Sequence, residues 1–320
     1  MGYPEPMKAA AGRSGLIFPT LFVLGLSPLC LAVPLIQAQT VSPTSTTTDA
    51  DGLASTILTL GNIPTEYFVT ATCPTCRPEA STVTFRVCGK LENDDFKQFD
   101  VRWSSNTYDN ICYLSTDTAK IVRNCQDPRL AGLNVLPFTI GAKGCSMSAM
   151  AMLINYYAET FPALGVLSTT PAGLNLALGA MGKDGFGSKG DIKWKAIELV
   201  SGKNIKHDEE TDFIDISASA SASNRTTALA GSADPDLLSS QPGPVIFRFQ
   251  RTKLTVSGEL KKWNHFVLAV GKCGGKYVLA DPGGVFQSLV DPNEVIVRDS
   301  ATQDTAGPLT GVRRFRRRIP

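Results

Sequence analysis

The amino-terminal half of the chain alternates between apolar and polar positions in several short stretches. Residues 82–87 and 96–103 have a period of two, which predicts short strands. Upstream of them, residues 39–55 are rich in Ser, Thr, Asp and Pro and lack apolar periodicity, which indicates a flexible spacer. We therefore expect a small β-rich, cysteine-containing domain over residues 56–120.

The middle of the chain changes to a helical pattern. Residues 145–158 are a run of good helix formers with a broad apolar face, and Gly141 and Gly144 supply a turn in front of it. Cys145 is therefore expected at a helix N-terminus. A second, shorter helix is predicted over residues 192–200.

The last third of the chain returns to strands. Apolar runs over residues 244–250, 265–271, 276–280 and 285–290 are separated by Gly and Pro turns. A helix followed by antiparallel strands is an α+β arrangement. The arginine-rich residues 301–320 are interpreted as a basic C-terminal tail, solvated or at the rim of a last strand, with a polyanion-binding patch as the alternative.

The first 38 residues have the features of a targeting segment. Lys8 and Arg13 precede an uncharged stretch whose apolar centre runs over residues 16–33, and Ala38 offers a small residue for cleavage. We interpret residues 1–38 as a signal peptide, with an uncleaved membrane anchor as the alternative. In both cases the body leaves the cytoplasm, so the protein is expected to be secreted or to reside at the cell surface or in the periplasm.

Charge and composition narrow the function classes. A formal net charge of +2 over 320 residues provides no general attraction to nucleic acid or to anionic membranes, so neither is an expected partner. The apolar content of 43% is sufficient for a packed core and is not expected of a wholly disordered chain. The motifs of the chain imply no metal or organic cofactor.

Seven cysteines follow the leader, and export would place them where disulfides persist. Seven is odd, so at least one must stay unpaired or bond another chain. If Cys145 is the unpaired one, six remain for three disulfides of undetermined connectivity. Cys73 and Cys76 also have the spacing of a zinc knuckle, but Cys88 and Cys112 do not repeat it, and disulfides are the preferred interpretation.

Cys145 has one histidine partner in a suitable context. A thiol attacks a carbonyl well only as a thiolate, and a helix N-terminus and a neighbouring imidazolium both lower its pKa from about 8.5. Of the two histidines, His207 lies in a polar stretch and is expected in solvent, whereas His265 begins an apolar strand. Asp281 follows the next strand, so a hairpin would place its carboxylate where it fixes the tautomer of His265. Each residue also has a purely structural interpretation, but their order favours a catalytic triad.

Three segments, residues 139–157, 264–271 and 277–283, carry this candidate triad in order. Together they resemble the C39-like branch of the papain-like cysteine peptidases. The resemblance covers about residues 122–295 and implies a C39-like peptidase domain over 121–300. It also implies a papain-like α+β fold, in which the helix with the nucleophile packs on an antiparallel sheet, and hydrolysis of peptide bonds.

The resemblance further implies a glutamine that helps to bind the oxyanion. Many relatives have it six residues before the cysteine, where this chain has Thr139. Residues 125–129 resemble the Gln-x-Asp-Pro-Arg segment that some relatives carry farther upstream, so Gln126 is the candidate for this role. Ser146 follows the nucleophile, where glycine is frequent in the family.

Three functions compete at this point. The favoured one is an exported cysteine peptidase that acts on a peptide or protein substrate. An amidase or transferase acting on cell-wall peptides or isopeptide bonds would use the same triad. The third is a non-catalytic peptide-binding or surface module on a degenerate peptidase fold, which Thr139 and Ser146 favour.

Overall fold

The structure is a computed structural model that divides into two units, Met1–Gly89 and Lys90–Pro320. The predicted leader, residues 1–38, lies outside the described residues, and no helix within them is long and apolar enough to cross a membrane. The described residues are 40–42, 57–59, 66–72, 82–88, 96–114, 117–123, 125, 128–187, 190–209, 213–214, 244–255, 257–286 and 289–318.

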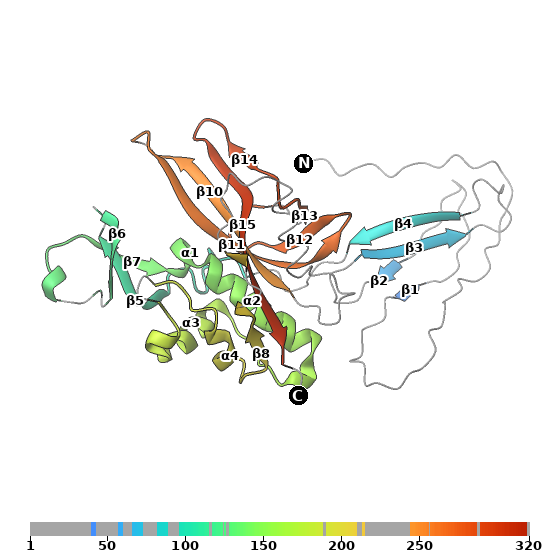
Figure 1. Cartoon of the computed structure of the whole chain (residues 1–320), viewed down its shortest axis with the longest axis horizontal. Helices are drawn as coiled ribbons and strands as arrows, with labels where there is room; N and C mark the ends of the chain where they lie inside the picture. Colours follow the sequence, from blue (N-terminus) through green and yellow to red (C-terminus); the bar gives the residue numbers. More distant parts are fainter. Residues whose placement is uncertain are drawn as a thin grey trace. The chain divides into compact units, whose positions relative to one another are not determined.

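The described part of the first unit consists of two antiparallel hairpins (Figure 1). In one, β1 (Thr40–Ser42) pairs with β2 (Ile57–Thr59). In the other, β3 (Glu66–Thr72) pairs with β4 (Thr82–Cys88). The strand predicted over residues 82–87 is confirmed.

An eight-stranded antiparallel sheet is the main element of the second unit (Figure 1). Its path runs β13-β12-β11-β10-β15-β14, and β8 and β9 pair with β15. The predicted α+β class is confirmed, and so are the strands expected over 244–250, 265–271 and 276–280. Among the described residues of the strand predicted over 285–290, only 289–290 are in a strand, β13. The strands are β8 (Ile205–His207), β9 (Phe213–Ile214), β10 (Val245–Leu254), β11 (Leu260–Cys273), β12 (Lys276–Ala280), β13 (Leu289–Val290), β14 (Ile296–Asp299) and β15 (Asp304–Arg317).

The basic C-terminal residues belong to this sheet. β15 lies between β10 and β14, so of the two interpretations of residues 301–320 the structure has a last strand, inside the sheet and not at its rim, and no solvated tail over Asp304–Arg317. Val312 and Phe315 are buried in β15, and so are Arg313 and Arg314. Two register shifts in the pairing of β15 with β10 interrupt the period-two alternation, and this concealed the strand in the sequence pattern.

A second, three-stranded sheet has the order β6-β5-β7. Its central strand is β5 (Thr107–Leu114), flanked by β6 (Asp117–Arg123) and β7 (Val135–Thr139). This sheet lies in the second unit, so the β-rich domain predicted over 56–120 does not form one body. The division after Gly89 leaves only its first strands in the first unit.

Residues 96–103 form turns and not the predicted strand. Trp103 is buried, and its indole N–H donates to the Lys97 carbonyl at 2.8 Å. The Trp103 ring also meets the Phe96 ring edge-on, with centroids 5.5 Å apart. The apolar and polar residues that alternate over 96–103 therefore belong to a turn, which is held by the packing of Phe96 against Trp103.

Helix α2 packs against β11 and supplies much of the core between the helices and the large sheet. Residues 147–157 of this helix are all buried, and the helix predicted over 145–158 is confirmed. The end of the predicted helix over 192–200 forms α4, whereas α3 was not predicted. The described helices are α1 (Ile140–Lys143), α2 (Cys145–Thr160), α3 (Pro171–Ala180) and α4 (Ala196–Val200), with 3-10 turns at η2 (Pro128–Leu130), η3 (Pro162–Leu164) and η4 (Gly182–Asp184).

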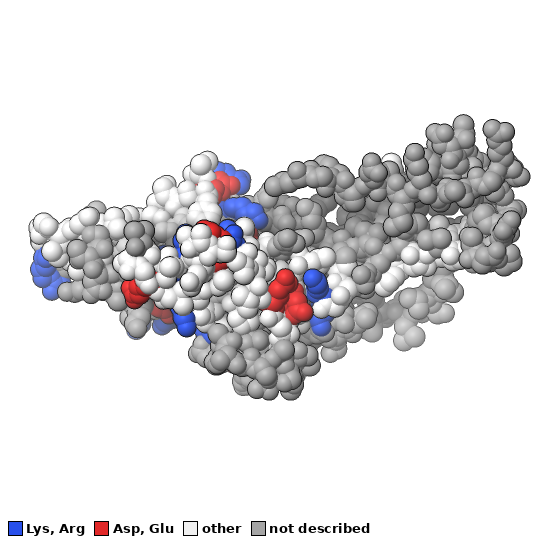
Figure 2. Space-filling model, turned by 90° about the horizontal axis from the view of Figure 1, so that it is seen from above, with Lys and Arg blue, Asp and Glu red and all other residues white. Residues whose placement is uncertain are grey.

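Charged side chains of both signs are interspersed over the described part of the face shown in Figure 2. Charged side chains also form ion pairs within the described residues. Arg251 and Asp304 approach to 2.9 Å in the sheet, and Arg102 and Asp100 approach to 2.6 Å. The described surface in that view thus follows the near-neutral composition of the chain.

Candidate active site

Cys145 lies where two helices meet. α1 ends at Lys143, Gly144 caps it, and Cys145 begins α2. A Cβ at residue 144 would collide with the carbonyl oxygen of Ile140, so the junction requires glycine. Cys145 forms no disulfide, and the residue as a whole is partly exposed. Its sulfur therefore sits at a helix N-terminus, as the sequence predicts.

The two sequence positions that depart from the family pattern have structural partners. Thr139 caps α1, because its hydroxyl accepts a hydrogen bond from the Ala142 N–H at 3.2 Å. Ser146 is hydrogen-bonded to the phenol of Tyr108 in β5, which also donates to the Lys143 carbonyl at 3.3 Å. Both residues thus help to hold the start of α2 in place.

Strand β11 presents His265 to Cys145. His265 lies opposite Phe249 of β10, and α2 packs against the same strand. The imidazole is 4% exposed and is hydrogen-bonded to the Cys145 thiol. Its Nε2 lies 2.6 Å from Oδ1 of Asp281. Nδ1 is therefore the ring nitrogen that faces the sulfur, and the structure brings the three predicted triad residues together.

A hairpin returns the chain to His265, as the sequence predicts. β12 pairs antiparallel with β11, with Cys273 opposite Lys276 at the turn and Leu268 opposite Ala280 at the far end. Asp281 follows directly after β12. Its position next to the histidine is thus set by strand pairing within one short stretch of chain.

The Asp281 carboxylate accepts four hydrogen bonds. Oδ1 lies 2.6 Å from the His265 ring and accepts from the Gly283 N–H at 2.7 Å. Oδ2 accepts from the N–H groups of Val285 at 2.6 Å and Phe286 at 2.7 Å. The loop after β12 therefore wraps around the carboxylate and fixes its orientation.

These contacts set the charges of the triad. Burial raises the pKa of Cys145, but the hydrogen bond and charge of His265, with the N–H groups of Phe266 and Ser146, outweigh it and leave the pKa below its usual value. Burial lowers the pKa of His265, but the bonds to Asp281 and Cys145 reverse this and raise it to about 9. Burial likewise raises the pKa of Asp281, and the His265 bond lowers it overall. Both shifts favour the pair in which Cys145 is a thiolate and His265 an imidazolium.

Gln126 lies outside the described residues, and a different glutamine reaches the site. Gln98 is 7% exposed, and its Nε2 donates to the Gly141 carbonyl at 2.9 Å. Its backbone N–H donates to the Pro282 carbonyl at 3.0 Å. The Gln98 side chain thus lies between the segment that precedes α2 and the loop that follows β12.

The sequence also carries a signal for Gln98. Residues 98–102, Gln-Phe-Asp-Val-Arg, have the Gln-x-Asp-x-Arg spacing, whereas Gln126 is followed directly by aspartate. Asp100 and Arg102 form a two-point ion pair, with Nε to Oδ1 at 3.0 Å and the terminal nitrogen to Oδ2 at 2.6 Å. This pair stiffens the turn that carries Gln98.

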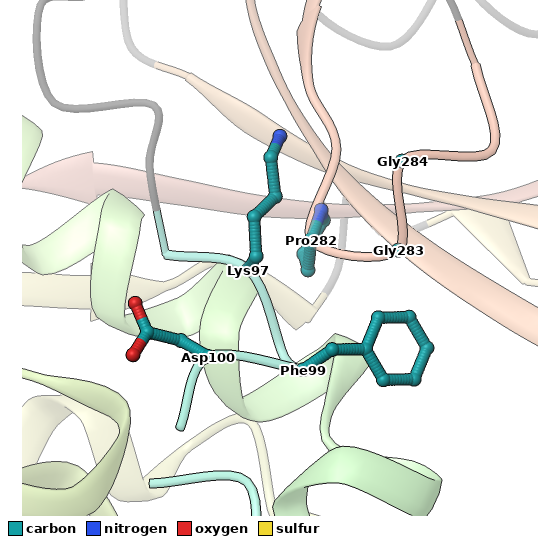
Figure 3. A pocket seen from close by; sticks show the side chains of 6 residues that line it. All are labelled: Lys97, Phe99, Asp100, Pro282, Gly283 and Gly284. Carbon is teal, nitrogen blue, oxygen red and sulfur yellow. The ribbon is translucent and has the colours of Figure 1, made fainter. Parts of the chain in front are cut away.

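An open groove of about 470 Å³ runs beside the loop of Asp281 (Figure 3). The Phe99 side chain, 62% exposed, supplies an apolar surface to it. The Lys97 ammonium donates a hydrogen bond to the backbone carbonyl of Asp281 at 2.9 Å. This bond links the wall that contains Lys97 and Phe99 to the wall formed by the loop after β12. The groove is lined by Lys97, Phe99, Asp100, Pro282, Gly283 and Gly284.

His207 is buried, which contradicts its predicted place in solvent. It is 6% exposed in β8, and its ring stacks on Phe315 of β15 with centroids 5.2 Å apart. Its backbone N–H donates to the Glu198 carboxylate at 3.3 Å. His207 thus packs the edge of the large sheet and is not part of the triad.

The cysteines outside the triad are predicted from the sequence to form disulfides or a zinc site. Cys73 and Cys76, considered for zinc or disulfides, lie outside the described residues. Cys273 in β11 is disulfide-bonded. Within the described residues, no group of three or more His, Cys, Asp or Glu side chains is arranged to hold a metal ion.

Comparisons with known proteins assign no family to this geometry. The chain matches no protein-family model, no curated protein and no solved structure. The residues of the site and their contacts are therefore the basis on which a function is proposed below.

Gly283→Ala should disable the triad without removing any of its side chains. A Cβ at this position would lie 2.6 Å from Cε1 and 3.1 Å from Nε2 of His265, so the imidazole must move. Without its ion pair, an ordinary thiol is only a few per cent thiolate at pH 7, so alkylation of Cys145 by iodoacetamide should slow about tenfold or more. Gly173→Ala in α3 is the control, and unchanged labelling in the Gly283 variant would contradict this account.

The alkylation rate of Cys145 should depend on pH through His265. In the parent protein we expect rapid labelling well below pH 8.5, because the thiolate is already formed there. In His265→Ala the lowering by the imidazole is lost and only the N–H groups of Phe266 and Ser146 still oppose burial, so the midpoint should rise toward about 8.5. Peptide mass spectrometry measures the labelled fraction at each pH. His207→Ala, the matched buried histidine, should keep the parent profile, and equal shifts in both variants would refute a specific role for His265.

Proposed function

We propose that this chain is an exported cysteine peptidase with a papain-like fold that hydrolyses peptide bonds through Cys145, His265 and Asp281. The observation that carries the proposal is the hydrogen-bonded series from the Cys145 thiol through His265 to Asp281, at a partly exposed helix N-terminus. A buried ion pair is costly to maintain, and a binding module has no need of it. A catalytic cysteine does need such an ion pair, because the thiolate is the nucleophile.

In the proposed reaction the Cys145 thiolate attacks the carbonyl carbon of the scissile bond. The imidazolium of His265 then gives its Nδ1 proton to the leaving amine, and the C–N bond breaks to leave a thioester on the sulfur. A water molecule, deprotonated by the now neutral His265, hydrolyses the thioester and restores both groups. Asp281 keeps its hydrogen bond to Nε2 throughout, which fixes the tautomer and stabilises the charged ring.

The proposal assigns stabilisation of the negative oxygen of the intermediate to two groups. One is the backbone N–H of Cys145 at the start of α2. The other is the Gln98 amide, which uses one N–H for the Gly141 carbonyl and has a second to donate. Gln98 thereby replaces Gln126 in the role that the family resemblance requires.

The groove beside Asp281 suits the departing half of the substrate. The proton donor, His265, must reach the leaving amine, so the residues after the cut pass the histidine on the side of Gly283. The groove opens there, and Phe99 offers an apolar contact to the first side chain beyond the cut. We therefore expect an apolar residue to follow the cleaved bond.

Cys145→Ala should abolish cleavage of an unfolded protein substrate by the purified chain. The substitution removes the sulfur that forms the thioester in the proposed reaction. Because alanine is only slightly smaller than cysteine, the fold should be little disturbed. Fragments are identified by mass spectrometry, which also gives the residues on both sides of each cut. Cleavage that persists in the variant would end the proposal, and release of new amines from cell-wall peptides alone would point to an amidase.

Gln98→Ala should lower kcat by about 10²-fold, because one oxyanion donor is lost. Alkylation of Cys145 should stay close to the parent rate, since the ion pair is untouched. Gln126→Ala is the matched variant and is expected to keep the parent kcat. The opposite ranking of the two variants would restore Gln126 as the oxyanion residue.

A further inference from the structure

Two cysteines outside the triad lie together in the three-stranded sheet. Cys112 is in the central strand β5, opposite Val122 of β6, and is fully buried. Cys125 lies two residues beyond the end of β6 at Arg123 and is partly exposed. The two side chains are hydrogen-bonded to each other. The hairpin thus holds two sulfur atoms in contact.

The backbone on the Cys112 side of this pair is held in place. Cys112 is held by strand pairing on both sides, since β5 lies between β6 and β7 and pairs Cys112 with Pro137. Cys125 follows the same hairpin out of β6, so no distant part of the chain has to move. Burial and the Cys112 thiol together raise the pKa of Cys125 to about 12, which agrees with close packing of the two sulfurs.

We propose that Cys112 and Cys125 form a disulfide under oxidising conditions. The oxidant is a small disulfide such as oxidised glutathione. One cysteine thiolate attacks it and releases one glutathione thiol, and the second cysteine thiolate then displaces the other from the mixed disulfide. The two cysteine thiols lose two protons and two electrons, and one glutathione disulfide is reduced to two thiols.

The bond would brace the side of the site that carries the nucleophile. β5 also contains Tyr108, which contacts Ser146 and the Lys143 carbonyl at the start of α2. β7 runs directly into α1 at Ile140. A link across residues 112–125 therefore restrains the sheet from which α1 and α2 begin.

The pairing also agrees with the cysteine count. With Cys145 free, joining Cys112 to Cys125 leaves an even number beyond the leader. One of that remaining set, Cys273, is already disulfide-bonded. The odd cysteine is then the one at the helix N-terminus.

Peptide mapping of the full chain tests the proposal. The Cys145→Ala protein, chosen to prevent exchange, is incubated with oxidised glutathione, denatured, treated with iodoacetamide and digested without reduction. We expect one cross-linked peptide pair that joins Cys112 to Cys125, lighter by two hydrogen atoms than the two thiol peptides. Carbamidomethylation of both residues, or a bond from Cys112 to any other cysteine, would overturn the assignment. The mapping needs no activity, so it stands or falls separately from the proposed peptidase function.

The bracing role has its own measurement. Adding dithiothreitol should lower the Tm of the parent protein, and the drop should be smaller by about 5 °C or more in Cys125→Ser, which has no such bond to lose. Comparing the drops within each protein cancels the effect of the substitution itself. Equal drops in the two proteins would show that the bond does not stabilise the domain.

Discussion

The hydrogen-bonded carboxylate of Asp281 is the constraint on which the rest of the site depends. Taking a carboxylate out of water costs several kcal/mol, and the four hydrogen bonds to Asp281 offset that cost. Because three of them come from backbone N–H groups of the following loop, the carboxylate cannot rotate away from His265. The fixed Nε2 contact leaves Nδ1 to face the sulfur of Cys145. The orientation of the His265 ring toward Cys145 therefore follows from the buried charge of Asp281.

The same loop couples the sheet to the segment that carries Gln98. Lys97 donates to the Asp281 carbonyl, and the Gln98 backbone donates to the Pro282 carbonyl. The Gln98 side chain then reaches the Gly141 carbonyl just before α2. One irregular segment thus links the loop that holds His265 to the helix that begins with Cys145. A displacement of the loop would therefore also shift the start of α2, and this coupling favours a site with one well-defined geometry.

The sequence predicts those parts of the site that depend on local structure. Cys145 sits at the start of a strongly patterned helix, and His265 and Asp281 are neighbours in one hairpin, so periodicity and turn residues suffice to place them. Gln98 is held by tertiary contacts to two distant segments, and the alternation around it resembles a strand although the residues form turns. The strand β15 is concealed for a different reason, since register shifts break its alternation and arginines occupy buried positions.

The electrostatics that activates Cys145 also separates it from the proposed disulfide. A thiol with a lowered pKa is a good leaving group, so any disulfide that Cys145 forms is readily displaced. Cys125 has the opposite character, because its raised pKa makes its thiolate a poor leaving group and its bond to Cys112 hard to displace. One domain can therefore hold a lasting crosslink and a reactive thiol in the same oxidising surroundings. The two sulfurs differ in their surroundings: an imidazolium lowers the pKa of Cys145, whereas burial, together with a second thiol, raises the pKa of Cys125.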